Sequence, residues 1–122
     1  MAISQPMMIV RYLHQYIKRN LDKDLTLNQL ASHLSFNPSY LSRMHREVTG
    51  IKLSDYICTA RIEHAKGLLE HTNKSIADIA KAVGYENSSC FSRAFKRHEG
   101  ISPSKYRAYN KIGKDSWPIF ND

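Results

Sequence analysis

The chain has 122 residues, of which 42% are hydrophobic, and its 18 Lys and Arg outnumber 11 Asp and Glu, which gives a formal net charge of +7. This length fits one domain or two very small ones. The basic balance favours a polyanionic partner, nucleic acid before an acidic membrane surface. Cys58 and Cys90 are the only cysteines, which excludes a disulfide scaffold and favours a reducing, cytoplasmic location. No apolar run approaches the roughly 20 residues of a membrane helix, and no signal-peptide pattern opens the chain.

The chain contains an internal repeat. The stretch FNPSYLSRMHREVTG, residues 36–50, resembles YENSSCFSRAFKRHEG, residues 85–100, and each has a Ser-Arg pair seven residues before a glycine. An offset of 49 aligns the segments before these stretches, and an offset of 50 aligns the segments after the turn, because the second turn is one residue longer. Matching runs at a fixed offset indicate a duplicated supersecondary unit.

Each copy is predicted to form two helices around a tight turn. In the first copy, Thr26 is a good N-cap with Gln29 three residues later, and Asn37 followed by Pro38 starts a second helix that ends at Gly50. The spacing of apolar residues predicts that the inner face of this second helix consists of Leu41, Met44, His45 and Val48.

The second copy repeats this pattern. Ser75 is the predicted N-cap, Gly84 permits the turn, Asn87 or Ser88 starts the second helix, and Gly100 ends it. The residues predicted to face inward on the two helices are Ile76, Ile79, Ala80, Val83, Phe91, Ala94 and Phe95.

Three further helices are predicted over residues 5–20, 54–72 and 102–110, so the expected fold is all-α with about seven helices. The middle one is long enough to link the two copies. Its inner side is predicted to include Ile57, Arg61, Ala65 and Leu68. The predicted organisation is an N-terminal helix-turn-helix subdomain at 7–53, a linker helix at 54–72, a C-terminal helix-turn-helix subdomain at 73–110 and a tail at 111–122. Nothing in the pattern assigns a role to the tail residues Trp117, Ile119 and Phe120.

The outward face of each second helix carries serines beside arginines, with the acids Glu47 and Glu99 only near the helix ends. An ordinary solvated helix mixes Glu with Lys instead. The DNA major groove admits one helix, where Arg pairs with guanine and Ser donates or accepts. The candidate base-reading residues are Ser39, Ser42, Arg43, Ser88, Ser89, Ser92 and Arg93. The candidate phosphate contacts are Arg46, Lys96, Arg97, Asn37 and Asn87.

The segment RIEHAKGLLEHTNKSIADIAKAVGYENSSCFSRAFKRHEGISPSKYR, residues 61–107, resembles the signature region of the AraC/XylS transcriptional regulators. The resemblance covers about residues 7–109 and implies two helix-turn-helix units, as in the stand-alone members without a ligand-binding domain. It implies that a monomer reads two successive major grooves of double-stranded DNA, and that RNA polymerase is a partner in activation. Control by protein abundance is then the expected form of regulation.

Three positions depart from the family pattern. His45 stands where an aromatic residue parallel to Phe95 is usual, which predicts a core residue, with a pH switch as the alternative. Cys90 lies beside the second reading face, as a small filler or, alternatively, a redox sensor. The first reading face lacks the bulky aromatic or amide residues of some relatives, so its base preference cannot be transferred.

The alternatives differ in class. No metal-binding or catalytic motif is present, so we expect no enzyme, no metal and no cofactor. A basic protein-binding adaptor, or the detached C-terminal half of a larger ligand-gated regulator, remains open. A helix with one strongly basic and one bulky apolar face is missing, which argues against a membrane partner. The leading prediction is a sequence-specific DNA-binding transcriptional regulator and activator that acts as a monomer.

Overall fold

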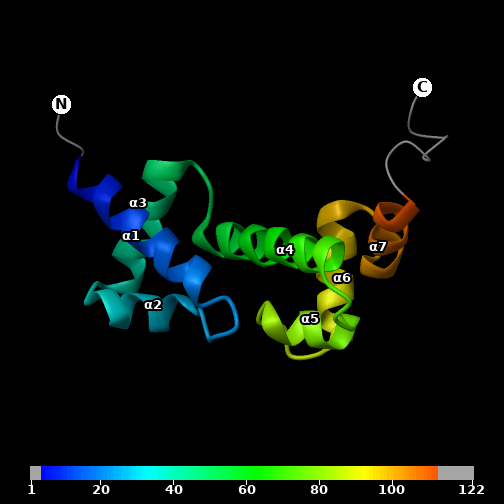
Figure 1. The fold of residues 1–122 in the computed structure, drawn as a ribbon. Helices are drawn as coiled ribbons and strands as arrows, with labels where there is room; N and C mark the ends of the chain where they lie inside the picture. The colour runs from blue at the N-terminus through cyan, green and yellow to red at the C-terminus, as the bar shows by residue number, and fades with distance from the viewer. Residues whose placement is uncertain (1–3, 113–122) are drawn as a thin grey trace, which may run out of the picture. The chain divides into compact units, whose positions relative to one another are not determined.

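The computed structural model describes residues 4–112, and the predicted tail residues Trp117, Ile119 and Phe120 lie outside this range. Seven α-helices and no strand occupy the described range, which confirms the all-α prediction (Figure 1). No helix in this range is long and apolar enough to span a bilayer. The chain divides into two compact units after Ala60, inside the fourth helix, and each unit is described by itself. The helices are α1 Gln5–Arg19, α2 Leu27–Leu34, α3 Pro38–Thr49, α4 Leu53–His71, α5 Ile76–Ala82, α6 Ser88–Glu99 and α7 Pro103–Ile112.

The first unit packs α1, α2, α3 and the first turns of α4 around one core. The predicted caps are confirmed: the Thr26 hydroxyl accepts from the Gln29 N–H at 3.3 Å, and Gly50 ends α3 with φ of +82°. Ser35 adopts a left-handed conformation, φ of +60°, and reverses the chain between α2 and α3. The core consists of Leu13, Ile17, Leu21, Leu25, Leu30, Ala31, Leu41, Leu53 and Ile57.

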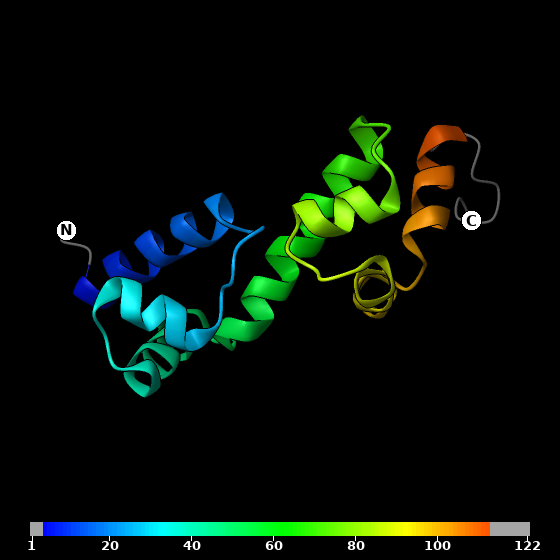
Figure 2. The same ribbon diagram turned by 90° about the horizontal axis from the view of Figure 1, so that it is seen from below.

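The second unit is built from the C-terminal part of α4 with α5, α6 and α7, and Figure 2 shows α7 beside the end of α4. The Ser75 hydroxyl accepts from the Asp78 N–H at 3.0 Å, and Gly84 makes the turn with φ of +93° where the first copy uses Ser35. Arg107 ties α7 to the last turn of α4 and to the segment after it through hydrogen bonds to backbone carbonyls. The buried side chains include Ile62, Ala65, Leu69, Ile79, Ala80, Val83, Phe91, Ala94 and Phe95.

Burial along α3 and α6 follows the same order at every aligned position except one, where Tyr40 is exposed and Cys90 is partly buried, so the repeat in sequence is also a repeat in packing. The predicted inner faces are confirmed except at Val48 and Ile76. Val48 is 36% exposed, because it lies in the last turn of α3, where the helix has passed the core. Ile76, the first residue of α5, is only partly buried.

The predicted buried side of α4 is partly wrong. Leu53 and Ile57 are buried in the first unit, and Ile62, Ala65 and Leu69 in the second, whereas the predicted Arg61 and Leu68 are only partly buried. A single stripe assumes one core along the helix. Because α4 contributes to two cores, the helical spacing of its buried residues is interrupted between them. The next buried residue after Ile57 is Ile62, one position later than a step of four residues predicts.

His45 is a core residue, as predicted, with no exposed surface. Its Nδ1 lies 3.0 Å from the Ile51 carbonyl, and its Nε2 lies 2.8 Å from Nε2 of His14. A carbonyl only accepts, so Nδ1 of His45 carries the proton and Nε2 of His14 donates to His45. The His14 ring is stacked on Tyr56 with ring centroids 3.7 Å apart. The arrangement requires Nε2 of His45 to be unprotonated, so the His45 ring is neutral.

The surroundings keep both rings neutral. Burial, together with the nearby His45 and Lys18, lowers the pKa of His14 to about 4. Burial also lowers the pKa of His45, although its hydrogen bond to the Ile51 carbonyl acts in the opposite direction. Both shifts reflect the cost of placing a positive charge in this part of the core.

We predict that the first unit loses stability as the pH falls from about 6.5, the ordinary histidine pKa, towards 4. In that window the unfolded chain binds protons at both positions more readily than the folded chain does, because folding lowers both histidine pKa values. Each histidine lowers the free energy of unfolding by at most about 1.4 kcal/mol for each unit by which the pH falls. Urea unfolding at pH 7 and pH 5 measures the change.

The double variant H14Q/H45F is the control, since it removes both titrating groups and places at 45 the residue found at 95. Its unfolding free energy is expected to change less between the two pH values than that of the unchanged chain. Equal changes in both proteins would contradict the assignment.

Candidate nucleic-acid interface

The outward face of α3 holds the residues predicted for the first reading face. Ser39, Arg43 and Arg46 are exposed, and Ser42 is partly buried. Asn37 caps the helix, and its Oδ1 accepts from the Tyr40 N–H at 3.2 Å. This hydrogen bond uses the amide oxygen of Asn37. The Nδ2 group remains as a donor, which is the part of the side chain that can bind an anion.

A cleft of about 440 Å³ runs against this face. No carboxylate lines it, and its lining includes three cationic side chains. Four of its lining residues, Leu27, Lys52, Leu53 and Ser54, were not predicted from the sequence as part of the site. The full lining is Leu27, Ser39, Ser42, Arg43, Arg46, Lys52, Leu53 and Ser54.

Tyr40 adds an aromatic ring at the edge of the α3 face. The side chain is 42% exposed, and its ring centroid lies 5.8 Å from that of Phe36. The sequence predicted a face without bulky aromatic residues, because only the serine and arginine positions were assigned to it. The available signal was the place of Tyr40 in the first turn of α3, next to Ser39.

The face of α6 is organised in the same way. Ser89, Arg93, Lys96 and Arg97 are exposed, whereas Ser88 and Ser92 are partly buried. Asn87 is the N-cap, and its Oδ1 accepts from the Cys90 N–H at 2.9 Å. Cys90 is a partly buried free thiol. Its Sγ lies 3.6 Å from Nη2 of Arg93, one turn along the helix.

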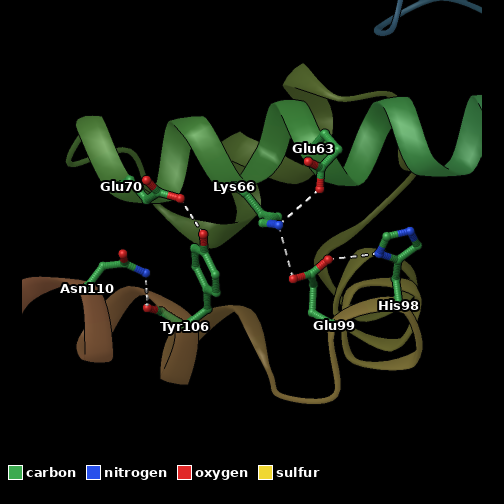
Figure 3. A network of polar contacts seen from close by, with 7 residues as sticks. All are labelled: Glu63, Lys66, Glu70, His98, Glu99, Tyr106 and Asn110. Carbon is green, nitrogen blue, oxygen red and sulfur yellow. Dashed lines mark hydrogen bonds and ion pairs between the residues drawn. The ribbon is translucent and has the colours of Figure 1, made fainter. Parts of the chain in front are cut away.

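The acid at the end of α6, Glu99, is paired with cations other than those of the outward face. Figure 3 shows Lys66 of α4 between Glu63 of the same helix and Glu99 of α6. Its Nζ lies 3.0 Å from Glu63 and 3.3 Å from Glu99, and Glu99 also meets His98 at 2.8 Å. Burial alone would raise the pKa of Glu99, but hydrogen bonds with His98 and Lys66 bring it below its usual value. Glu99 therefore stays charged and bound to α4.

Tyr106 of α7 forms the other side of this network. Its hydroxyl donates to Glu70 of α4, and burial with this hydrogen bond raises the pKa of Tyr106 to about 12 (Figure 3). The Lys66 ammonium also lies 5.9 Å from the Tyr106 ring centroid, within reach of a cation–π contact. The network therefore joins α4, α6 and α7.

The two faces have the chemistry of a polyanion-binding surface. Within residues 4–112, Arg43, Arg46, Arg93, Lys96 and Arg97 form no ion pair with an acid of the chain. Unpaired cations beside short hydroxyl groups match phosphate oxygens and base edges. No cluster of three or more metal-binding side chains occurs in the same range.

Comparison with protein families gives a match to the helix-turn-helix domain over residues 30–109. The melibiose operon regulatory protein of Escherichia coli (strain K12) is 35% identical over 103 residues. The match covers 84% of this chain and 34% of that protein, so the chain spans about a third of the length of this relative.

Solved structures of similar fold include the C-terminal domain of AraT, a response regulator from Geobacillus stearothermophilus. That domain superposes with a TM-score of 0.82 and 40% identity, over 86% of this chain and 88% of that chain. The DNA-binding domain of AdpA, a global transcriptional factor solved in complex with a target DNA, also has a TM-score of 0.82. It is 23% identical over 93% of this chain and 99% of that chain, which supports the fold alone.

We predict that Lys66→Met lowers the free energy of unfolding of the second unit by about 1–3 kcal/mol, because Glu99 then keeps a partly buried charge with His98 but without its lysine partner. Urea unfolding at pH 7 measures the loss. Lys66→Arg retains a cation and is expected to recover part of the stability. Lys81→Met, at an exposed lysine of α5, is the matched control and should have little effect. An equal loss in the Lys66→Met and Lys81→Met variants would contradict the role given to Lys66.

Proposed function

This chain belongs to the AraC/XylS family of helix-turn-helix transcriptional regulators, and we propose that it is a sequence-specific regulator that binds double-stranded DNA through α3 and α6. The observation that carries the proposal is the repeated surface. Both helices bury the same three positions and expose Ser-Arg faces whose cations have no acidic partner in the described chain. A packing role alone does not require such a surface twice.

The proposed division of labour follows side-chain chemistry. Arg43 and Arg93 donate to guanine edges in the major groove, and the serines allow close approach and donate or accept hydrogen bonds. The cations farther along each helix hold phosphates, which fix the position of the protein but carry little sequence information. The proposed base-reading set is Ser39, Ser42, Arg43, Ser88, Ser89, Ser92 and Arg93. The proposed phosphate set is Arg46, Lys96, Arg97, Asn37 and Asn87.

The proposed complex is a monomer on an asymmetric site. Two unlike faces in one chain need no palindrome, unlike the two equal faces of a symmetric dimer. The 7–53 and 73–110 subdomains would occupy successive major grooves, with the helix at 54–72 between them. Activation through RNA polymerase, in the cytoplasm of a bacterium and without catalysis by this chain, completes the proposal.

The length of the relatives favours one alternative. The melibiose operon regulatory protein is about three times as long as the matched region, so this sequence also fits the DNA-binding part of a longer, ligand-gated regulator. Both versions make the same prediction for α3 and α6. They differ in whether a small molecule changes operator affinity.

We predict that the protein binds a mixed pool of random DNA duplexes with an affinity that falls steeply with salt, by a slope of about −0.9 in log K against log salt for each phosphate contacted. Fluorescence anisotropy between 50 and 300 mM KCl gives the slope. A basic protein-binding adaptor would show little binding to duplex DNA, and that result would overturn the proposal.

We predict that Arg93→Ala weakens binding to a duplex selected from the pool by about 1–3 kcal/mol and relaxes the choice at one base pair. Lys96→Ala, the matched control on the same helix, should weaken all sequences alike and reduce the salt slope by about one. Gel-shift titrations with the selected duplex and with single-base variants measure both. Unchanged specific affinity of the Arg93→Ala variant would contradict the base-reading assignment.

A further inference from the structure

The two copies differ at the turn that follows the outward-facing helix. With the offset of 50, Lys52 aligns with Ser102. Both occupy the residue before a helix, because the Lys52 carbonyl accepts from the Tyr56 N–H at 3.0 Å and the Ser102 carbonyl from the Tyr106 N–H at 2.9 Å. The Ser102 hydroxyl also caps α7 by accepting from the Lys105 N–H at 3.2 Å. A lysine ammonium has donors only, so Lys52 cannot cap α4 in this way.

Lys52 instead contributes to the cleft beside α3. Arg43 and Arg46 enter the cleft from α3, and Ser54 enters it from the first turn of α4. Asp55, the acid of that first turn, is not among the lining residues. None of the three cations has an acidic partner in the described chain. Three positive charges around one cleft repel each other unless an anion binds there.

The turn that presents Lys52 is held by the core. The Thr49 hydroxyl donates to the His45 carbonyl at 2.7 Å and accepts from the Ile51 N–H at 3.2 Å. The Ile51 carbonyl accepts from Nδ1 of the buried His45 at 3.0 Å. The backbone before Lys52 is therefore held on both sides of Ile51, through its N–H and through its carbonyl. An anion bound at Lys52 needs to order only the lysine side chain, which lowers the entropic cost of binding.

We propose that Lys52, together with Arg46, binds one backbone phosphodiester of the duplex that α3 reads. The inference rests on the proposed function, and it adds Lys52 and the cleft to the DNA-binding surface. The position favours a backbone phosphate as the occupant because Ser39, Ser42 and Arg43, the proposed base-reading residues of α3, line the same cleft. A phosphate at the edge of the groove would fix the depth and register of α3.

The first test compares Lys52→Ser, Lys52→Arg and Arg11→Ser on the selected duplex and on random duplexes. Lys52→Ser installs the residue of the second copy, so its melting temperature should be unchanged or raised while both kinds of duplex bind more weakly, by about three- to tenfold at 0.1 M salt. Its salt slope should be smaller by about 0.9. Lys52→Arg should retain the affinity. Arg11→Ser removes an exposed cation outside the cleft and should change the slope less.

The outcomes separate the inference from the function. If the unchanged protein binds duplex DNA with a steep salt slope but Lys52→Ser has the same slope, the proposed phosphate contact of Lys52 is wrong and the proposed function stands. If the unchanged protein does not bind duplex DNA at all, the proposed function fails, and the proposed phosphate contact fails with it.

A second test locates the phosphate. Neutral methylphosphonate groups replace the phosphates of the selected duplex one at a time. One replacement should weaken DNA binding by the unchanged protein as much as the Lys52→Ser substitution does. The same replacement should not weaken DNA binding by the Lys52→Ser variant any further, because both changes remove the same contact. Inorganic phosphate at constant ionic strength should not displace the duplex from the unchanged protein more than from the variant. Additive losses at every position, or selective displacement by inorganic phosphate, would overturn the assignment to the DNA backbone.

Discussion

The exposed Ser-Arg faces depend on side chains that hold α3 and α6 from the opposite side. In the first unit, a residue of α1 contacts α3 near its C-terminal end and also a tyrosine of α4. In the second unit, a residue of α4 contacts α6 near its C-terminal end and also a tyrosine of α7. The spacing of Val10, Leu13 and Ile17 equals that of Ile62, Ala65 and Leu69, and in this alignment His14 corresponds to Lys66. His14 contacts His45 of α3 and is stacked on Tyr56, while Lys66 contacts Glu99 of α6 and the ring of Tyr106. The orientation of each face is thus set by a polar contact added to an apolar core.

The two contacts respond differently to protons because their chemistry differs. In the His14–His45 contact Nε2 of His45 accepts, and the proton on Nδ1 of His45 is fixed by the Ile51 carbonyl. A proton added to this pair gives a buried charge and removes an acceptor. The Lys66–Glu99 contact joins two charged groups, and their mutual hydrogen bonds lower the pKa of Glu99 and raise that of Lys66. As the pH falls from 6.5, the His14–His45 contact loses stability because folding lowers both histidine pKa values. The Lys66–Glu99 contact loses stability only below the ordinary carboxyl pKa, because folding lowers the pKa of Glu99.

Local signals in the sequence were sufficient for much of this fold. Thr26, Asn37, Ser75 and Asn87 act as caps because their oxygens accept from N–H groups in the next turn, which depends on few other residues. The glycines at 50, 84 and 100 have positive φ for the same local reason. The predicted buried side of α4 was partly wrong because this helix contributes to two cores. The predicted burial of Val48 was wrong because it depends on where along α3 the packing against the core ends. The pairing of Lys66 with Glu99 brings together distant parts of the chain, which periodicity does not reveal. Lys52 was visible as a break in the repeat, but its meaning required the cleft.

The duplication has kept its core and changed its surface. Leu41 and Phe91, Met44 and Ala94, and His45 and Phe95 are buried at equivalent positions although their volumes differ, so each pair must be compensated within its own unit. On the surface the aligned residues differ in chemical character: Tyr40 aligns with Cys90, and Lys52 aligns with Ser102. Such changes are tolerated by a core that does not contact them, and they alter what each face can bind. Two copies with equivalent buried positions and different surfaces suit a bipartite DNA site whose halves are unlike, because selection can then act on the surface of one copy without disturbing the fold of the other.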